Sequence, residues 1–292
     1  MAQLWRFHLP GDDRVFGFLT SHTVAHMPWT NDFQLRESTQ SVELAPKGVT
    51  DLPESSAAAI ARLLKRAQDA GSFSKLDKWP GEKFPVLGAP FPFAIDRAIA
   101  PFFGIVSTGV QLTVYVRGKG GLIDGIWLAR RGIHKSTYAG MLDNAVGGAV
   151  EHGEMPFTSL MREAEEELGI DASAAVSGGA VSWFNVKGGK SGLHPGLVEP
   201  GVQYVYDLEV ESNVTLSPAE SGIEWLRLLS IDKVKAAILQ HEFKPSCACV
   251  MIDLFVRHGI INAENERDFA EIVSRLHRQL LLPTDFPHTE GR

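Results

Sequence analysis

The sequence predicts an α+β protein, in which an α/β/α sandwich follows an N-terminal α+β domain. Strand-like apolar segments precede and follow one acidic helical segment between residues 110 and 229, and further helical segments close the chain. This order favours a sheet that is covered by helices. The length of 292 residues favours two domains, because a domain averages about 150 residues. We expect the first domain to span residues 1–105 and the second to span residues 106–292.

The first domain is expected to combine short strands with one helix. Strand patterns occur within residues 4–20, on either side of a Pro-Gly-Asp-Asp turn. A helix capped by Ser55 or Ser56 is expected to run to about Ala70, before a glycine that ends it. Residues 78–93 are rich in proline, glycine and aromatic side chains, so we expect a loop that packs between the two domains.

The second domain is expected to contain strands before and after a central helix. The strands are expected at 110–116, 126–130, 142–146, 181–186, 202–210 and 224–229. The helices are expected at 156–168, 232–240, 247–258 and 265–281.

Composition and charge exclude several kinds of partner. The net charge of −7 lacks the basic excess typical of nucleic-acid-binding domains. No stretch reaches the roughly 18 apolar residues of a membrane span, so we expect a cytoplasmic protein without a membrane partner. Cys247 and Cys249 have no zinc-site spacing and are interpreted as small core residues. The sequence leaves open whether two copies form a homodimer.

Residues 147–170 carry the pattern most typical of a chemical site. On a helix, Glu163, Glu166 and Glu167 share one face, beside an apolar stripe. Three like charges on one face repel each other. A divalent cation would remove this cost, because Mg²⁺ prefers oxygen ligands. A solvated acidic face is the alternative for the glutamates alone, but the neighbouring glycines, Glu154 and Arg162 favour a site.

This segment resembles the Nudix box, G-x5-E-x7-R-E-U-x-E-E-x-G-U, where U is a bulky aliphatic residue. Every fixed position is matched, with the smaller Ala164 at the first U position. The matching residues are Gly148, Glu154, Arg162, Glu163, Glu166, Glu167, Gly169 and Ile170. The resemblance implies the Nudix α/β/α sandwich and metal-dependent hydrolysis of a diphosphate linked to another moiety.

The resemblance also implies residue roles. Glu163, Glu166 and Glu167 would be the catalytic residues and would bind Mg²⁺ or Mn²⁺ together with the Gly147 carbonyl. The supporting residues would be Gly148, Glu154, Arg162 and Gly169. The metal would neutralise the diphosphate and lower the pKa of a bound water. A carboxylate would then take a proton from that water, and we favour Glu166, although the sequence does not separate ligand from base.

A narrower resemblance extends beyond the box. Residues 103–116, 126–150, 202–210 and 243–261, with an N-terminal extension, look like the Nudix group related to thiamin pyrophosphokinase. That group implies hydrolysis of oxothiamin or oxythiamin diphosphate to the monophosphate and phosphate. Gln111 and Thr113 stand where the group has His and Asn, and only Glu224 of an expected acidic pair is matched.

Further candidates for substrate contact lie outside the box. Arg130, Arg131 and Lys135 would clamp phosphates, because guanidinium and ammonium groups suit them. Aromatic side chains that would line a pocket or stack on a ring are Trp79, Phe84, Trp183 and Tyr204. Glu199 and Glu224 are candidates for an extra metal ligand or base.

Three other functions compete with this reading. A sugar nucleotide or dinucleotide would be an alternative substrate. An isopentenyl diphosphate isomerase has a related fold, but it needs a catalytic cysteine and glutamate, and the cysteines here lie in a C-terminal helical segment. A Nudix sensor domain typically loses glutamates of the box, whereas this chain has kept them.

Overall fold

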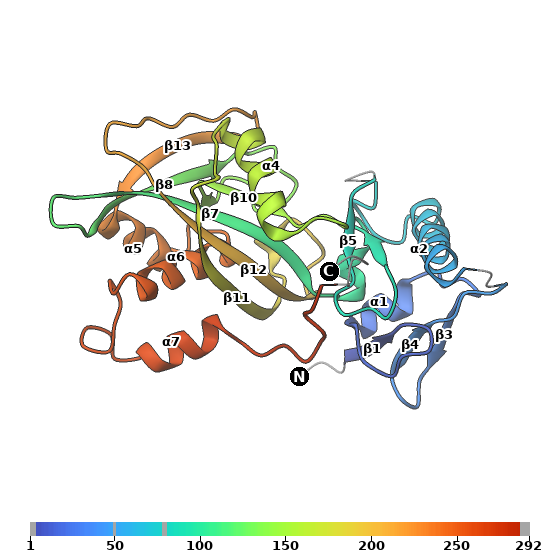
Figure 1. Ribbon diagram of the computed structural model, residues 1–292. Coiled ribbons are helices and arrows are strands. Elements are labelled where there is room, and N and C mark those ends of the chain that lie inside the picture. Colours follow the sequence, from blue (N-terminus) through green and yellow to red (C-terminus); the bar gives the residue numbers. More distant parts are fainter. Residues whose placement is uncertain (1–3, 49–50, 78–80, 287–292) are drawn as a thin grey trace.

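The computed structural model describes residues 4–48, 51–77 and 81–286 (Figure 1). A smaller N-terminal domain lies against one end of a larger sandwich of helices around a curved sheet. The predicted α+β class is therefore confirmed. Within the described ranges, no helix has the length and apolar character that crossing a membrane requires.

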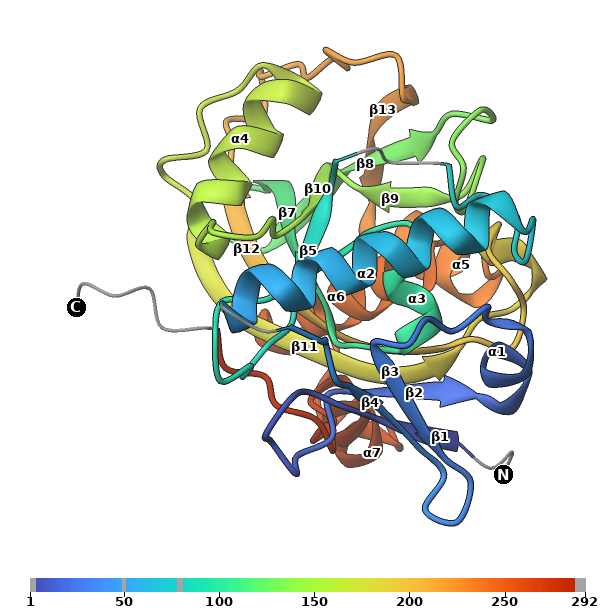
Figure 2. The ribbon, with the colours of Figure 1, turned by 90° about the vertical axis from the view of Figure 1, so that its right-hand side faces the viewer.

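The N-terminal domain is built on a four-stranded sheet with the order β2-β1-β4-β3. Its strands are β1 (Leu4–His8), β2 (Gly17–Thr20), β3 (Phe33–Arg36) and β4 (Ser41–Leu44). Helix α1 (Ser21–His26) follows β2, and the long helix α2 (Leu52–Asp69) crosses the domain in Figure 2. The predicted caps Ser55 and Ser56 are wrong, because the cap is Asp51, whose carboxylate accepts the Glu54 N–H at 2.8 Å. The helix therefore begins at Leu52, earlier than predicted.

A short hairpin connects this domain to the sandwich. Strands β5 (Lys83–Pro85) and β6 (Ala94–Asp96) pair in antiparallel fashion, and helix α3 (Ala100–Phe103) leads into the large sheet. The expected loop over 78–93 is therefore partly a strand. Trp79 lies outside the described residues.

The sandwich contains a seven-stranded sheet, whose central path is β11-β12-β7-β8-β13. Its strands are β7 (Ser107–Arg117), β8 (Ile123–Arg131), β9 (Leu142–Asn144), β10 (Val146–Ala149), β11 (Val176–Val186), β12 (Val198–Glu209) and β13 (Ile223–Ser230). Its helices are α4 (Pro156–Leu168), α5 (Ile231–Leu239), α6 (Pro245–Arg257) and α7 (Phe269–Leu276), with the short 3₁₀ turn η1 (Gly189–Ser191). Helix α4 covers one face, and α5 and α6 cover the other (Figure 1).

Two of these elements differ from the sequence expectation. The single strand expected over 142–146 is divided, because β9 pairs with β8 whereas β10 pairs with β7. The helix expected over 265–281 is shorter, because His277 already forms a bridge to Ser182 of β11. The division between β9 and β10 matters for function, since it brings the two glycines of β10 beside α4.

Alternation along β7 separates two cores. Val110, Leu112 and Val114 are buried under α4, whereas Tyr115 is buried with residues of α6 on the other face. Gln111 shares that second face, where the thiol of Cys247 lies 3.9 Å from its amide oxygen. The start of β7 thus carries polar side chains into the interior.

The two domains are packed against each other. The Phe18 ring of β2 meets the Phe184 ring of β11 edge to face, with ring centres 5.8 Å apart. A Cβ on Gly104, which follows α3, would lie 2.9 Å from a methyl group of Val198 in β12, so only glycine fits this approach. Further along, the Ser74 N–H donates to Nε2 of His194 at 3.1 Å. The N-terminal domain is therefore packed on the sandwich and is not a tethered module.

Candidate active site

Helix α4 presents the acidic face to the interior. The helix spans Pro156–Leu168 as expected, and Gly169 ends it in the left-handed conformation at φ 64°. Leu160, Ala164 and Leu168 are buried in the core under the sheet. Phe157, in the first turn of the helix, is 41% exposed.

Two of the three glutamates line a cavity. Glu163 and Glu167 belong to its wall together with Gly147 and Gly148 of β10. The Gly147 N–H donates to Oε2 of Glu167 at 2.9 Å. Burial, with the nearby charges of Asp143 and Glu163, raises the pKa of Glu167 to about 8. Burial also raises the pKa of Glu163, although the positive charges of Arg162 and Arg97 oppose this.

The glycine at position 148 is required by the position of Glu163. A Cβ built on Gly148 would lie 2.0 Å from the carboxyl carbon of Glu163 and 2.1 Å from its Oε1. Any side chain at residue 148 would therefore displace the carboxylate.

Arg162 holds the outer part of the box together. Its guanidinium donates to both carboxylate oxygens of Glu154 at 3.1 Å, to Glu163 at 2.9 Å and to Glu166 at 3.4 Å. The pKa of Glu154 is lowered, mainly by this hydrogen bonding. Glu166 has a side chain that is 57% exposed and lies outside the cavity wall. The loop before α4 is thus fixed to the helix by a charge network.

The carboxylates suit a hard divalent cation. In the ranges that the structure describes, no group of three or more His, Cys, Asp or Glu side chains is arranged to hold a metal ion as it stands. Arg162 instead balances the charges of Glu163 and Glu166. Two partly buried carboxylates that face one cavity nevertheless supply the oxygen donors that Mg²⁺ prefers. The Gly147 N–H points to Glu167, and in an extended strand the carbonyl of a residue points to the same side as its N–H. The Gly147 carbonyl therefore also faces Glu167.

The cavity has a volume of about 460 Å³ and is lined by both domains. The sandwich contributes the carboxylates of α4, the first residues of β7 and the loop after β8. The N-terminal domain contributes Glu82, Phe84 and Arg97 of the hairpin region, with Ala100 and Pro101 of α3. The expectation that Phe84 lines a pocket between the domains is confirmed.

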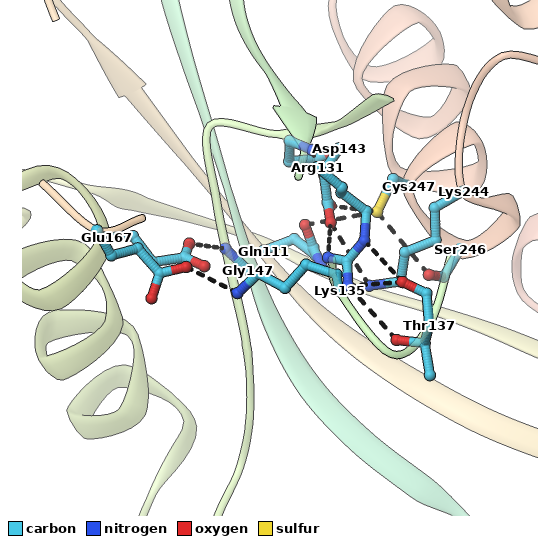
Figure 3. Close-up of polar contacts among 12 residues, drawn as sticks. Gln111, Arg131, Lys135, Thr137, Asp143, Gly147, Glu167, Lys244, Ser246 and Cys247 are labelled. Atoms are coloured by element: carbon cyan, nitrogen blue, oxygen red, sulfur yellow. Dashed lines mark hydrogen bonds and ion pairs between the residues drawn. The ribbon is translucent and has the colours of Figure 1, made fainter. Parts of the chain in front are cut away.

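A second polar cluster lies across the cavity from α4 (Figure 3). Arg131 binds Asp143 at 2.7 Å and the Thr137 carbonyl at 3.0 Å. The Cys247 thiol donates to Asp143 at 2.6 Å, and Lys244 lies 3.8 Å from the same carboxylate. Burial opposes ionisation of Asp143, but Lys244 and Arg131 hold its pKa below the usual range. Arg131 is thereby fixed at the cavity wall.

Sequence reasoning missed Asp143 and Lys244 as part of this cluster. They are separated by about a hundred residues, and no local motif joins them. The fold brings them together because β9 runs beside the start of α6, with the Lys244 N–H donating to the Leu142 carbonyl at 3.0 Å.

Three predicted substrate or metal residues lie outside the cavity. Arg130 points to the opposite face of β8 from Arg131, because successive strand residues alternate; it donates to the Gly140 carbonyl at 2.6 Å. Tyr204 faces away for the same reason and packs against Phe286, with ring centres 5.7 Å apart. Glu224 is exposed on β13. These three placements correct the sequence expectation.

Other predicted residues do reach the cavity. Lys135 lines it and pairs at 2.7 Å with Glu220, an acidic residue that sequence reasoning passed over in favour of Glu224. Glu199 lines it and forms an ion pair with Lys187. The buried Thr108 hydroxyl and the Trp183 ring N–H also belong to cavity-lining residues, and neither has a hydrogen-bond partner within the described residues.

The structure combines an α/β/α sandwich with a carboxylate-bearing helix that lies against a glycine-rich strand end, which is the arrangement that the Nudix box implies. The chain belongs to the Nudix family: residues 109–247 match the model of the NUDIX domain, and two plant relatives that are 30–31% identical to the chain are named Nudix hydrolases. Nudix hydrolases generally use a divalent metal. Residues 3–107 match a domain of unknown function, DUF4743.

Curated relatives share both parts of the chain. An uncharacterized protein of Saccharomyces cerevisiae is 31% identical over 234 residues, which cover 77% of this chain and 68% of that protein. Nudix hydrolase 20, chloroplastic, of Arabidopsis thaliana is 31% identical over 78% of this chain and 59% of its own length. Nudix hydrolase 24, chloroplastic, of the same plant is 30% identical over 74% of this chain and 58% of its own length. The chain thus spans less than two thirds of either plant protein.

Proposed function

We propose that this chain hydrolyses the diphosphate of a small organic diphosphate to the monophosphate and inorganic phosphate. The favoured substrates are thiamin-like diphosphates, namely oxothiamin and oxythiamin diphosphate. The observation that carries the proposal is the two-part cavity. Glu163 and Glu167 stand at one part, and aromatic and polar side chains from both domains line the rest.

The metal of the proposed site is Mg²⁺ or Mn²⁺. Glu163, Glu166 and Glu167 would hold it, with the Gly147 carbonyl as a further oxygen donor. When bound, the metal neutralises the diphosphate oxygens and lowers the pKa of a water. Glu166 remains our prediction for the residue that takes the proton, and its contact with Arg162 must then be released.

The phosphate groups are proposed to meet cations on the second wall. Arg131 is fixed by Asp143, so its guanidinium loses little freedom when it binds a phosphate oxygen. Lys135 stands in the same cavity and is paired with Glu220. These two contacts would orient the diphosphate against the glutamates of α4.

The organic group is proposed to lie against Trp183 and Phe84, where flat apolar surface and a few polar groups meet. The polar side chains of the same wall would read its edges. Oxothiamin lacks the cationic thiazolium, and oxythiamin replaces an amino donor with a carbonyl acceptor. Since a mispaired buried polar group costs about 1–3 kcal/mol, we expect at least tenfold higher kcat/KM for these compounds than for thiamin diphosphate.

The competing functions are distinguished by other observations. A sugar nucleotide or dinucleotide is the second candidate, since the box itself does not select the organic group. An isopentenyl diphosphate isomerase would need a reactive thiol, but Cys247 is fully buried, its pKa is raised to about 12 by burial, and its proton is donated to Asp143. A sensor without activity is disfavoured by the complete set of glutamates.

A substrate panel tests the proposal. Substrate loss and product formation would be followed by anion-exchange chromatography for oxothiamin, oxythiamin and thiamin diphosphates, ADP-ribose, a nucleotide sugar and a dinucleotide polyphosphate, with Mg²⁺ and with EDTA, because only the terminal diphosphates release inorganic phosphate. We expect Mg²⁺-dependent turnover that is fastest for the first two compounds. Faster cleavage of a nucleotide sugar or dinucleotide would replace the thiamin-like substrate with the second candidate.

A further inference from the structure

The hairpin region of the N-terminal domain forms part of the wall that encloses the box glutamates. Glu82, Phe84 and Arg97 line the same cavity as Glu163 and Glu167. Figure 1 shows β5 on the side of the N-terminal domain that faces the sandwich. A domain of unknown function therefore contributes charged and aromatic groups to the candidate active site.

This placement is fixed by contacts at several points of the interface. The ring of Phe18 meets the ring of Phe184 in β11, and Lys75 donates to the Ser136 carbonyl of the sandwich at 3.2 Å. The positive charge of Lys83 in β5 also reaches the box loop, where it adds to burial in lowering the pKa of His152. The hairpin thus lies against the box as part of a packed interface.

Arg97 is held in a defined position on the cavity wall. Its guanidinium forms an ion pair with Glu82 and lies over the ring of Phe84, 5.7 Å from the ring centre. The side chain is 32% exposed, so it is partly covered but still accessible from the cavity. A guanidinium that is already held by a ring and a carboxylate loses less conformational freedom on binding an anion than a freely moving arginine does.

We propose that Arg97 binds an oxygen of the substrate diphosphate near Glu163, so that the N-terminal domain supplies a substrate-binding residue to the hydrolase. This inference rests on the proposed hydrolysis of organic diphosphates. A guanidinium presents five N–H donors in a planar fork that matches phosphate oxygens. Its hydrogen bonds to phosphate are charge-assisted and stronger than neutral ones. The N-terminal domain is thereby part of the site and not only a support for it.

The test compares Arg97 with a matched arginine of the same domain. Arg14 also pairs with an aspartate and lies over a phenylalanine ring, at 5.2 Å from the centre of Phe16, but it does not line the cavity. Arg97→Ala is expected to raise KM for the best diphosphate substrate about 10–100-fold, the range of one charged hydrogen bond. Arg97→Lys should recover part of this loss, and Arg14→Ala should leave KM within twofold.

Glu82→Gln separates binding from structure. If Arg97 serves the substrate, removing its acidic partner frees the guanidinium and should lower KM, whereas Arg97→Ala raises KM. If the Arg97–Glu82 pair only stabilises the hairpin, both substitutions should cause the same loss with a similar fall in Tm. Equal losses, or an Arg97→Ala variant with KM within twofold of the wild type, would overturn the proposal.

A binding measurement keeps the result independent of turnover. Calorimetric titration of methylenebisphosphonate with Ca²⁺ in place of Mg²⁺ should show at least tenfold weaker binding to Arg97→Ala than to the wild type or Arg14→Ala. Equal affinity of the three proteins, or no binding by the wild type, would overturn the proposal. If the wild type binds the bisphosphonate but hydrolyses no diphosphate, the proposed function fails while the role of Arg97 in binding is still decided.

Discussion

Gly148→Ala is expected to lower activity strongly while leaving most of the fold intact. The added Cβ would lie 2.0 Å from the carboxyl carbon of Glu163, whereas ordinary contact begins near 3.4 Å. The carboxylate must therefore move by about 1.4 Å. Since a displacement of about 1 Å at a reacting centre costs on the order of 100-fold in rate, we expect kcat/KM to fall by about that factor.

The stability of this variant should change much less than its activity. The colliding atoms belong to the end of a flexible side chain, so the helix itself need not shift. Overpacking of this kind costs about 1–3 kcal/mol, or a few degrees in Tm. Thermal unfolding followed by circular dichroism would check this beside the steady-state rates.

Gly120→Ala is the matched control for this experiment. A Cβ at residue 120 meets no atom within 4 Å, and the residue is not in the left-handed region. Wild-type rates are expected for Gly120→Ala. A Gly148→Ala protein with kcat/KM within threefold of the wild type would refute the assignment of Glu163 to the site.

Three further predictions concern the supporting structure. A chain that begins at Ile105 should aggregate or lose substrate affinity, because it exposes surface now covered by the N-terminal domain. Size-exclusion chromatography and KM would show this. A soluble protein with unchanged kcat/KM would mean that the N-terminal domain is not part of the site. Arg162→Met should lower the free energy of unfolding by about 1–3 kcal/mol in urea, because Glu154 and Glu163 lose their shared partner; an unchanged midpoint and slope would contradict this. Burial, together with the charges of His22 and Lys75, lowers the pKa of His194, so the folded state binds fewer protons than the unfolded state. The free energy of unfolding is therefore highest above the ordinary pKa near 6.5, and part of it is lost as the pH falls toward the lowered pKa of the folded state. Denaturation at pH 7.5 and 5.5 should then show a larger loss for the wild type than for His194→Gln, and equal losses would exclude this role.

The helix that carries the glutamates is the element that local sequence describes best. Proline at its first position, glycine after its last and an apolar stripe at helical spacing act within one segment, so Pro156–Leu168 was predictable without knowledge of the rest. The short strands β3 and β4 were not expected from the sequence. They are stabilised by pairing with each other and with β1 and by burial in the domain core, and a local sequence pattern does not show such contacts.

The site was predictable only where its residues belong to one motif. The box supplied Glu163, Glu167 and Gly148, which lie together in the structure. The choice between Arg130 and Arg131 depended on which face of β8 meets the cavity, and a resemblance of sequence does not state this register. The contribution of Arg97 depended on the packing of two domains, which no spacing along the chain reveals.

The central claim is that the glutamate face of α4 catalyses metal-dependent hydrolysis of a diphosphate. The most direct measurement is the initial rate of hydrolysis of the best substrate as a function of Mg²⁺, for the wild type and for Glu163→Gln, Glu166→Gln and Glu167→Gln. We expect a saturable dependence on Mg²⁺, no turnover in EDTA, and a fall in kcat of roughly two to four orders of magnitude in the variants. Turnover that persists in EDTA, or Glu163→Gln and Glu167→Gln variants with wild-type kcat, would contradict the claim.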